Sequence, residues 1–251
     1  MPLKLSSNLN LDNVIKNLGQ KQILVPHIDM AIGQGDFVWN FDYEPKQGDN
    51  AWHPSGDCTP SLYELYQKTS QPQQEQIGPA LRKIFMIGHF YHQYLQWVIE
   101  RRLEFCGPDD VERRGIKGWG FYPRDESSFR PYHWATGSAD ICPCVIPGEG
   151  EFIVDFKTAH PRLYATGMNP DYLAKWECQG NIYMDFFDME RALFIIIDKS
   201  NGDMKELVFE RNQPLVDAIY TKWKIVGACL EEGIEPPEEE HIELPLRGPS
   251  T

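Results

Sequence analysis

Two aspartates and a lysine lie on either side of a predicted turn, Pro147-Gly148-Glu149-Gly150. If the flanking segments pair as a hairpin centred between residues 147 and 148, Asp140 and Asp155 lie at equal distances from the centre and face each other. Lys157 follows Asp155 by two residues and therefore points to the same face of the sheet. A one-residue bulge in either strand would break this register.

Two ionised carboxylates this close repel each other, and a divalent cation with oxygen ligands would remove the repulsion. Lys157 beside the cation could orient or activate a metal-bound water and stabilise the charge that develops when a phosphodiester is attacked. Asp140, Asp155 and Lys157 therefore indicate metal-dependent phosphodiester hydrolysis. The alternative is an ordinary ion pair at a strand end, which is the common role of an isolated D-x-K triplet.

Three motifs follow one another along the chain: Gly137-Ser138-Ala139-Asp140, Val154-Asp155-Phe156-Lys157 and Gln179-Gly180-Asn181-Ile182-Tyr183. This series resembles the G-x-x-D, D/E-x-K and Q-x-x-x-Y motifs of the PD-(D/E)XK nuclease superfamily. The RecB-like branch, which includes phage-type recombination exonucleases, is the most similar. Gly88-His89-Phe90-Tyr91-His92 resembles the G-x-x-x-H element of that branch, and the likeness spans roughly residues 81–210.

The resemblance implies a restriction-endonuclease-like core and an Mg²⁺- or Mn²⁺-dependent DNA exonuclease used in recombination, replication or repair. It assigns catalysis to Asp140, Asp155 and Lys157. Metal binding is assigned to the side chains of His92, Asp140 and Asp155 and to the carbonyl of Phe156. Gln179 and Tyr183 would brace the site or contact DNA.

Two of these roles have structural alternatives. His92 shares a helix face with Gly88 and Leu95, and a buried histidine bonded to a backbone carbonyl would show the same spacing. Gln179 and Tyr183 are four residues apart on one helix face, so a structural Gln–Tyr pair is the alternative to a DNA contact.

Hydrophobic periodicity predicts the elements that position these residues. Helices are expected at 81–104, 171–188 and 213–231. Strands are expected at 117–124, 131–145, 151–157, 191–198 and 204–210, with an Asn201-Gly202 turn before the last. This order indicates an α/β or α+β fold with a central mixed sheet flanked by helices. We expect an N-terminal arm or small subdomain at 1–70, the nuclease core at 71–231 and an acidic C-terminal tail at 232–251.

The net charge of −13 argues against a protein that coats nucleic acid nonspecifically. Much of the excess negative charge comes from glutamates after residue 230, which we expect to be solvated. Local positive charge must then hold DNA. Arg113, Arg114 and Lys117, in the loop predicted after the first helix, are the candidates for binding phosphates, and Trp119 and Tyr122 beside them could stack bases.

The expected partner is linear duplex DNA or a single-stranded end, and a recombination partner protein and a homo-oligomer are left open. We expect a cytoplasmic location, since the sequence shows no long apolar segment and no signal peptide.

Residues 53–63 resemble the S…C-P-R…Y segment of RecB-like relatives, in some of which the cysteine binds an iron–sulfur cluster. Ser61 replaces the basic residue and only Cys229 lies beyond the last motif, so we expect no cluster and a packed Cys58 thiol.

Two other functions compete with the exonuclease. A structure-specific or restriction-type endonuclease would use the same chemistry on another substrate. A non-catalytic nucleic-acid-binding module on the nuclease scaffold would fit the acidic net charge, although the complete Asp140, Asp155 and Lys157 set argues against it.

Overall fold

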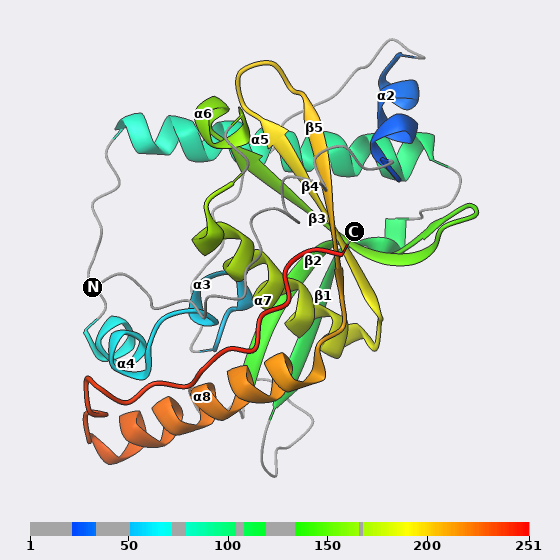
Figure 1. Cartoon of the computed structure of the whole chain (residues 1–251). Helices are drawn as coiled ribbons and strands as arrows, with labels where there is room; N and C mark the ends of the chain where they lie inside the picture. Colours follow the sequence, from blue (N-terminus) through cyan, green and yellow to red (C-terminus); the bar gives the residue numbers. More distant parts are fainter. Residues whose placement is uncertain are drawn as a thin grey trace.

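The computed structural model describes residues 22–33, 51–71, 79–103, 108–118, 134–165 and 168–250. Its centre is a five-stranded sheet in which the strands lie in sequence order (Figure 1). The strands are β1 (Val111–Gly118), β2 (Trp134–Ile146), β3 (Gly150–Ala159), β4 (Arg191–Asp198) and β5 (Met204–Glu210). Strands β3 and β4 are parallel and the other neighbours are antiparallel, so the sheet is mixed, as the sequence predicted.

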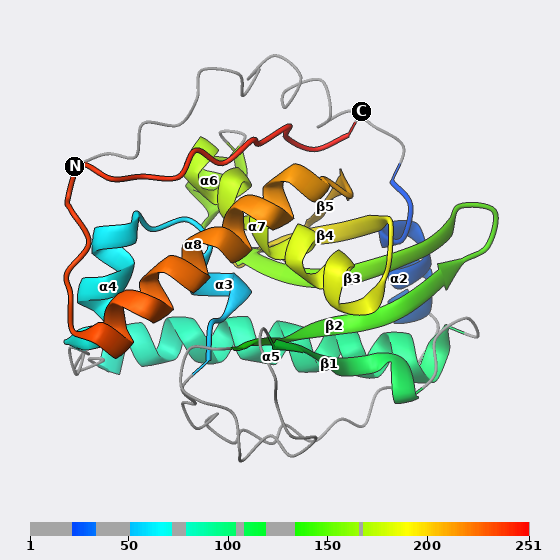
Figure 2. The same cartoon turned by 90° about the horizontal axis from the view of Figure 1, so that it is seen from below.

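Helices cover both faces of this sheet, as the two cartoon views show (Figures 1 and 2). One face is covered by α5 (Pro79–Arg102) and α2 (Val25–Gly33). The other is covered by α7 (Pro170–Phe187), with α6 (Pro161–Ala165) and α8 (Gln213–Glu232) beside it. The remaining helices of the described chain are α3 (Pro54–Asp57), α4 (Leu62–Ser70) and the short 3₁₀ helix η1 (Pro108–Asp110).

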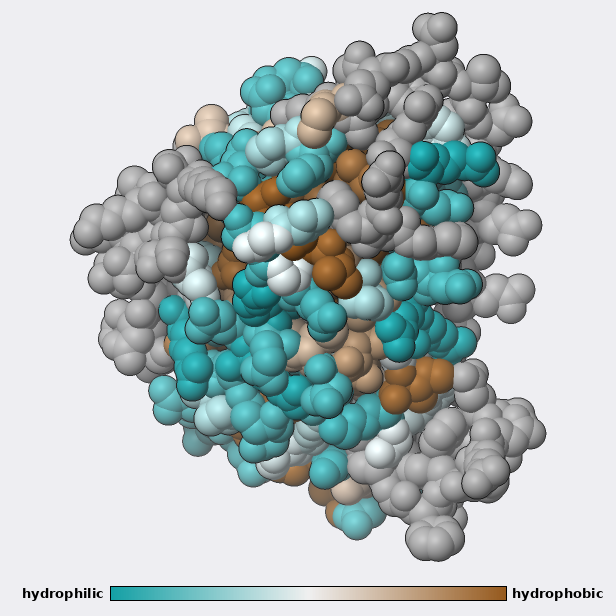
Figure 3. Space-filling model, turned by 90° about the vertical axis from the view of Figure 1, so that its right-hand side faces the viewer, coloured by the Kyte–Doolittle hydropathy of each residue, from teal (hydrophilic) through white to brown (hydrophobic). Residues whose placement is uncertain are grey.

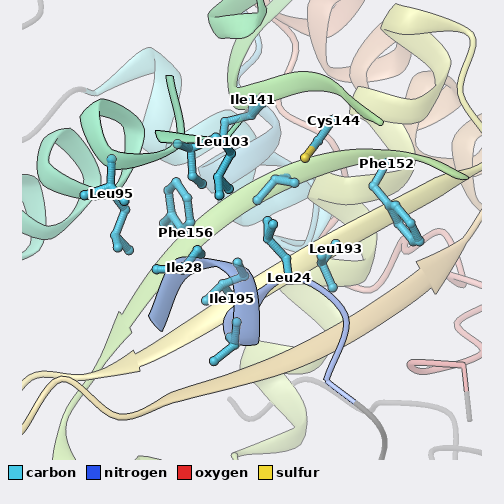
Figure 4. Close-up of a cluster of buried hydrophobic side chains, with 14 of the residues drawn as sticks. Leu24, Ile28, Leu95, Leu103, Ile141, Cys144, Phe152, Phe156, Leu193 and Ile195 are labelled. Atoms are coloured by element: carbon cyan, nitrogen blue, oxygen red, sulfur yellow. The ribbon is translucent and has the colours of Figure 1, made fainter. Parts of the chain in front are cut away.

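The core forms because alternate residues of the central strands point to opposite helical layers. Phe156 and Ile195 pack toward α5 and α2, in the cluster drawn in Figure 4. Ile153 and Phe194 pack toward α7. The uninterrupted apolar run 193–197 is buried on both sides, which is why it predicted a buried strand.

Strand β1 differs from the prediction, which placed it at 117–124. The observed strand begins earlier, at Val111, and is an edge strand with mostly exposed or half-buried side chains. Its charged sequence lacks the apolar signal of a buried strand, and residues 119–124 of the predicted strand lie outside the described residues. Arg113, Arg114 and Lys117 therefore lie on a strand and not in a loop. Trp119 and Tyr122 lie outside the described residues.

Residues 51–71 are anchored by α8, so they belong to the packed structure of the described chain. The indole of Trp223 donates to the carbonyl of Asp57 at 2.8 Å. The buried ammonium of Lys222 donates to the carbonyls of Cys58 and Pro60. Cys58 is a buried free thiol, as predicted.

The C-terminal segment combines the solvated glutamates predicted from the sequence with apolar residues that pack on the helices. Its glutamates are exposed, but Ile242, Leu244 and Leu246 pack along the cluster formed by α4, α7 and α8. The backbone N–H groups of Arg247 and Gly248 donate to the buried carboxylate of Glu177 at 2.7 and 2.8 Å. The segment 242–250, the C-terminal strap, runs beside α8 and α7 in Figure 1.

The surface of the side that carries the β2–β3 hairpin is mainly hydrophilic among its described residues, with small separate hydrophobic areas (Figure 3). No helix in the described part of the chain combines the length and apolar character needed to span a membrane.

Candidate active site

The predicted catalytic residues lie where β2 and β3 stop pairing. Their antiparallel pairing runs from Ile146–Gly150 to Ile141–Val154, and Asp140 and Asp155 are the next residue on each strand. Further along, Ala135 of β2 forms a bridge with Trp52. The two carboxylates therefore occupy the point at which the strands diverge.

The predicted register holds at the site, although the turn itself is centred half a residue later than the sequence estimate assumed. Next to the turn, Ile146 pairs with Gly150, so the hairpin is centred on Gly148. An irregularity between Ile141 and Cys144 then shifts the register by one residue. The pair Ile141–Val154 is consequently centred between residues 147 and 148, the centre assumed from the sequence.

Asp155 is held by one charged and one neutral donor. Its Oδ1 lies 2.7 Å from Nζ of Lys157, and its Oδ2 accepts from the amide of Gln179 at 2.9 Å. The side chain is 4% exposed. Lys157 also lies over the Phe194 ring, with Nζ 5.5 Å from the ring centre, which restricts where the ammonium can point.

Asp140 is held by three donors from two elements. Oδ1 lies 3.1 Å from Nδ1 of His92 and accepts from the amide of Gln96 at 3.1 Å. Oδ2 accepts from the backbone N–H of Phe156 at 2.7 Å. Helix α5 and strand β3 thus fix the orientation of this carboxylate together.

These surroundings shift the pKa values of the two acids in opposite directions. Burial raises the pKa of Asp155 to about 6, with a contribution from Asp140 and a partial offset from Lys157. Burial also acts to raise the pKa of Asp140, but His92, the Phe156 N–H and Lys157 together hold it below its ordinary value. Burial acts to lower the pKa of His92, and the Asp140 charge outweighs it, so that pKa is raised.

The donor set at this position fits a divalent cation of the Mg²⁺ type. Such an ion takes oxygen ligands and is held in proteins by one or two carboxylates plus waters and phosphate oxygens. Asp155 is buried with one ammonium, and a cation would favour its ionised form. Within the described residues, no group of three or more His, Cys, Asp or Glu side chains forms a ready-made metal cage.

His92 and Phe156, the other predicted metal ligands, lie at the site with different contacts. The sequence left open a hydrogen bond from His92 to a backbone carbonyl. In the structure, Nδ1 of His92 instead lies within hydrogen-bond distance of the Asp140 carboxylate. The side chain of Phe156 is buried among Leu95, Ile195 and their neighbours, and its N–H serves Asp140. Metal coordination by His92 and by the Phe156 carbonyl stays a prediction.

Gln179 and Tyr183 brace the site from α7. The amide nitrogen of Gln179 lies 3.0 Å from the Tyr183 hydroxyl as well as beside Asp155. Both side chains are buried, at 4% and 3% exposure. Burial, with a contribution from Asp155, raises the pKa of the Tyr183 hydroxyl well above its ordinary value. These contacts favour the bracing alternative over direct binding of DNA.

The three predicted basic residues on β1 all have protein partners. Arg113 lies over the Phe187 ring, with its guanidinium carbon 5.2 Å from the ring centre. Arg114 donates to Thr136 Oγ1 at 3.0 Å. Lys117 Nζ lies 2.6 Å from Oδ2 of Asp185. Their contact with DNA stays a prediction, and each would have to give up or share these partners.

Gln96 is the site residue that the sequence reasoning missed. It is 5% exposed and follows His92 by four residues on α5, so both side chains reach Asp140 from one helix face. A polar residue one turn after the candidate ligand, within an otherwise apolar stripe, was the available signal.

The fold and the site together define the class of architecture: a mixed α+β sheet flanked by helices, with two carboxylates and a lysine at the divergence of two strands. This arrangement is consistent with the nuclease-like core expected from the motifs. No protein-family model matches the sequence, and no curated protein matches it.

Solved structures with a similar fold include exonucleases. The crystal structure of SSO0001 is 12% identical, with 86% of each chain covered and a TM-score of 0.44. An alkaline exonuclease from Laribacter hongkongensis, LHK-Exo, is 16% identical over 74% of this chain and 90% of that chain, with a TM-score of 0.41. A phage related exonuclease from Haemophilus somnus 129PT is 15% identical over 68% and 82%, also at 0.41.

Proposed function

We propose that this protein is a Mg²⁺- or Mn²⁺-dependent deoxyribonuclease that degrades DNA from its ends. The observation that carries the proposal is the convergence of Asp140, Asp155 and Lys157 at the divergence of β2 and β3. Lys157 Nζ lies 2.7 Å from Asp155 Oδ1, and Asp140 is oriented by donors from α5 and β3.

Each residue has a role that its position supports. Asp140 and Asp155 would supply carboxylate oxygens to the cation, and Gln179 would keep Asp155 in place while it does so. When bound, the cation would polarise the phosphodiester and lower the pKa of water. Lys157 would hold its ammonium beside the attacked phosphate, where it stabilises developing negative charge. The buried Phe194 ring beneath it keeps the ammonium near Asp155.

Attack on DNA ends is supported by the motif order, which resembles that of phage-type recombination exonucleases. The described residues and the sequence show no helix-turn-helix or zinc finger that would read a base sequence. A role in recombination, replication or repair, with a partner protein, belongs to the same proposal. The acidic net charge means that DNA would be held by local basic groups such as Arg113 and Lys117.

The test is hydrolysis of end-labelled linear duplex DNA with Mg²⁺, by the wild type and by Asp155→Asn. We expect the wild type to release nucleotides, EDTA to stop the reaction, and Asp155→Asn to lower the rate by about 100-fold or more. Asp217→Asn is the matched control, because Asp217 is an exposed carboxylate on α8 that also accepts from a glutamine. Equal rates for wild type and Asp155→Asn would refute the assignment.

A covalently closed circle separates the exonuclease from the endonuclease alternative, since only an endonuclease cuts it. Linear DNA degraded while the circle survives supports the proposal. A non-catalytic binding module would bind the linear duplex without releasing any product, with Mg²⁺ or with Mn²⁺.

A further inference from the structure

Two neutral or weakly basic donors from one turn of α5 converge on a single oxygen of Asp140. His92 Nδ1 and Gln96 Nε2 each lie 3.1 Å from Oδ1. The two donors differ in their surroundings, because the His92 side chain is 28% exposed whereas Gln96 is 5% exposed. Gln96 is therefore the more enclosed of the two supports.

The two donors also differ in what they can do besides support Asp140. A neutral imidazole can coordinate a metal ion through a ring nitrogen, whereas the nitrogen of a side-chain amide only donates hydrogen bonds. If His92 turns its ring toward a cation, its bond to Oδ1 weakens or is lost. Gln96 then remains as the donor from α5 that holds Oδ1, while the Phe156 N–H holds Oδ2.

We infer that Gln96 is a positioning residue that keeps the Asp140 carboxylate oriented for a divalent cation. This inference rests on the proposed function, because it concerns the same metal site. Gln96 would act through Asp140, the carboxylate to which it donates. Partners that orient a metal-binding side chain commonly change metal affinity by about 10- to 100-fold when they are removed.

The test is calorimetric titration of the metal-free protein with Mn²⁺, which needs no substrate and no catalysis. Gln96→Met keeps the length of the side chain and removes the donor, and Gln96→Asn keeps the amide but shortens its reach. Both are expected to weaken Mn²⁺ binding by about 10- to 100-fold. Gln213→Met is the matched control, because Gln213 donates to the Asp217 carboxylate at 3.0 Å on an exposed face of α8.

The outcomes separate this inference from the proposed function. Wild-type affinity in both folded Gln96 variants, with binding abolished in Asp140→Asn, would overturn the role of Gln96 alone. No Mn²⁺ binding by the wild type would overturn the proposed metal site and the inference with it. Thermal unfolding of each variant shows whether it is folded. If Gln96→Met does not fold, Gln96→Asn decides.

Discussion

The amide nitrogen of Gln179 lies 2.9 Å from Oδ2 of Asp155, and this bond ties helix α7 to strand β3 at the candidate site. The same nitrogen lies 3.0 Å from the hydroxyl of Tyr183, one turn further along α7. One amide thus connects the buried carboxylate to a buried tyrosine, which makes the position of Asp155 dependent on the packing of α7.

Replacing Gln179 by Met should impair catalysis more than stability, because Met fills a similar volume but cannot donate to Asp155. We expect the rate of hydrolysis of linear DNA at saturating Mg²⁺ to fall by about 10- to 100-fold. Tyr183→Phe removes only the hydroxyl and leaves the Gln179–Asp155 bond, so its rate should fall less. A Tyr183→Phe rate below that of Gln179→Met would contradict this order of effects.

Gly137→Ala should disturb the site through Tyr183. A Cβ atom at residue 137 would lie 2.7 Å from Cε1 of Tyr183, which has no room to move because it is buried. We expect a loss of about 1–3 kcal/mol in the free energy of unfolding, together with a reduced kcat.

Gly115→Ala is the matched control for that substitution. Gly115 pairs with Gly137 across β1 and β2, and its added Cβ would lie 2.5 Å from the Phe186 ring. This variant should be destabilised to a similar extent, and once folded it should keep the wild-type kcat. Urea unfolding and initial rates measure the two effects, and an equal loss of kcat in both variants would show that packing alone is responsible.

Removal of the C-terminal strap should destabilise the protein. A chain ending at His241 would lose the apolar contacts of Leu244 and Leu246 and the two N–H groups that bind Glu177. We expect a loss of about 3 kcal/mol or more, since hydrogen bonds to a buried charge are strong. Neutralising Glu238, Glu239 and Glu240 together should change the free energy of unfolding by less than about 0.5 kcal/mol, because these side chains are exposed. Similar stabilities for the two variants in urea would contradict an anchoring role.

Glu177 should make the stability of the protein depend on pH. Burial raises its pKa in the folded protein, and the Arg247 and Gly248 N–H groups offset only part of that increase. Above the unfolded pKa of about 4.3, the folded state therefore binds more protons at this group than the unfolded state does, so its contribution falls as pH rises. Relative to Glu177→Gln, which does not titrate, the wild type should lose free energy of unfolding as the pH rises above about 4. Urea unfolding of both proteins across that range is the measurement, with Glu240→Gln as the control. If the free energy of unfolding of the wild type, relative to that of Glu177→Gln, stays constant or increases as the pH rises, Glu177 does not have the proposed effect on stability.

The sequence predicted the central elements well because their signals are local. The apolar run of β4 and the turn before β5 predicted both strands with the observed bounds, 191–198 and 204–210. The periodicity of α5, α7 and α8 predicted each helix to within two residues of its observed ends. These elements face the core directly, so their hydrophobic pattern is complete within their own sequence.

The parts that were missed depend on contacts distant in the sequence. The helices α2, α3 and α4 are short, and residues 51–71 are held by Lys222 and Trp223 of α8. The strap has an alternating apolar pattern, but its docking depends on a buried carboxylate of α7, 70 residues earlier in the chain. The bulge that restores the register at Asp140 contains Pro143, which cannot donate to the strand ladder, but the direction of the shift depends on the observed turn.

We propose that Lys157 acts in hydrolysis at a site formed by Asp140 and Asp155. Its most direct test is the rate of nucleotide release from linear duplex DNA by Lys157→Met at saturating Mg²⁺, with Mn²⁺ binding measured in parallel. We expect a rate lower than that of the wild type by about 100- to 1000-fold, with Mn²⁺ still bound. A rate equal to that of the wild type would contradict it.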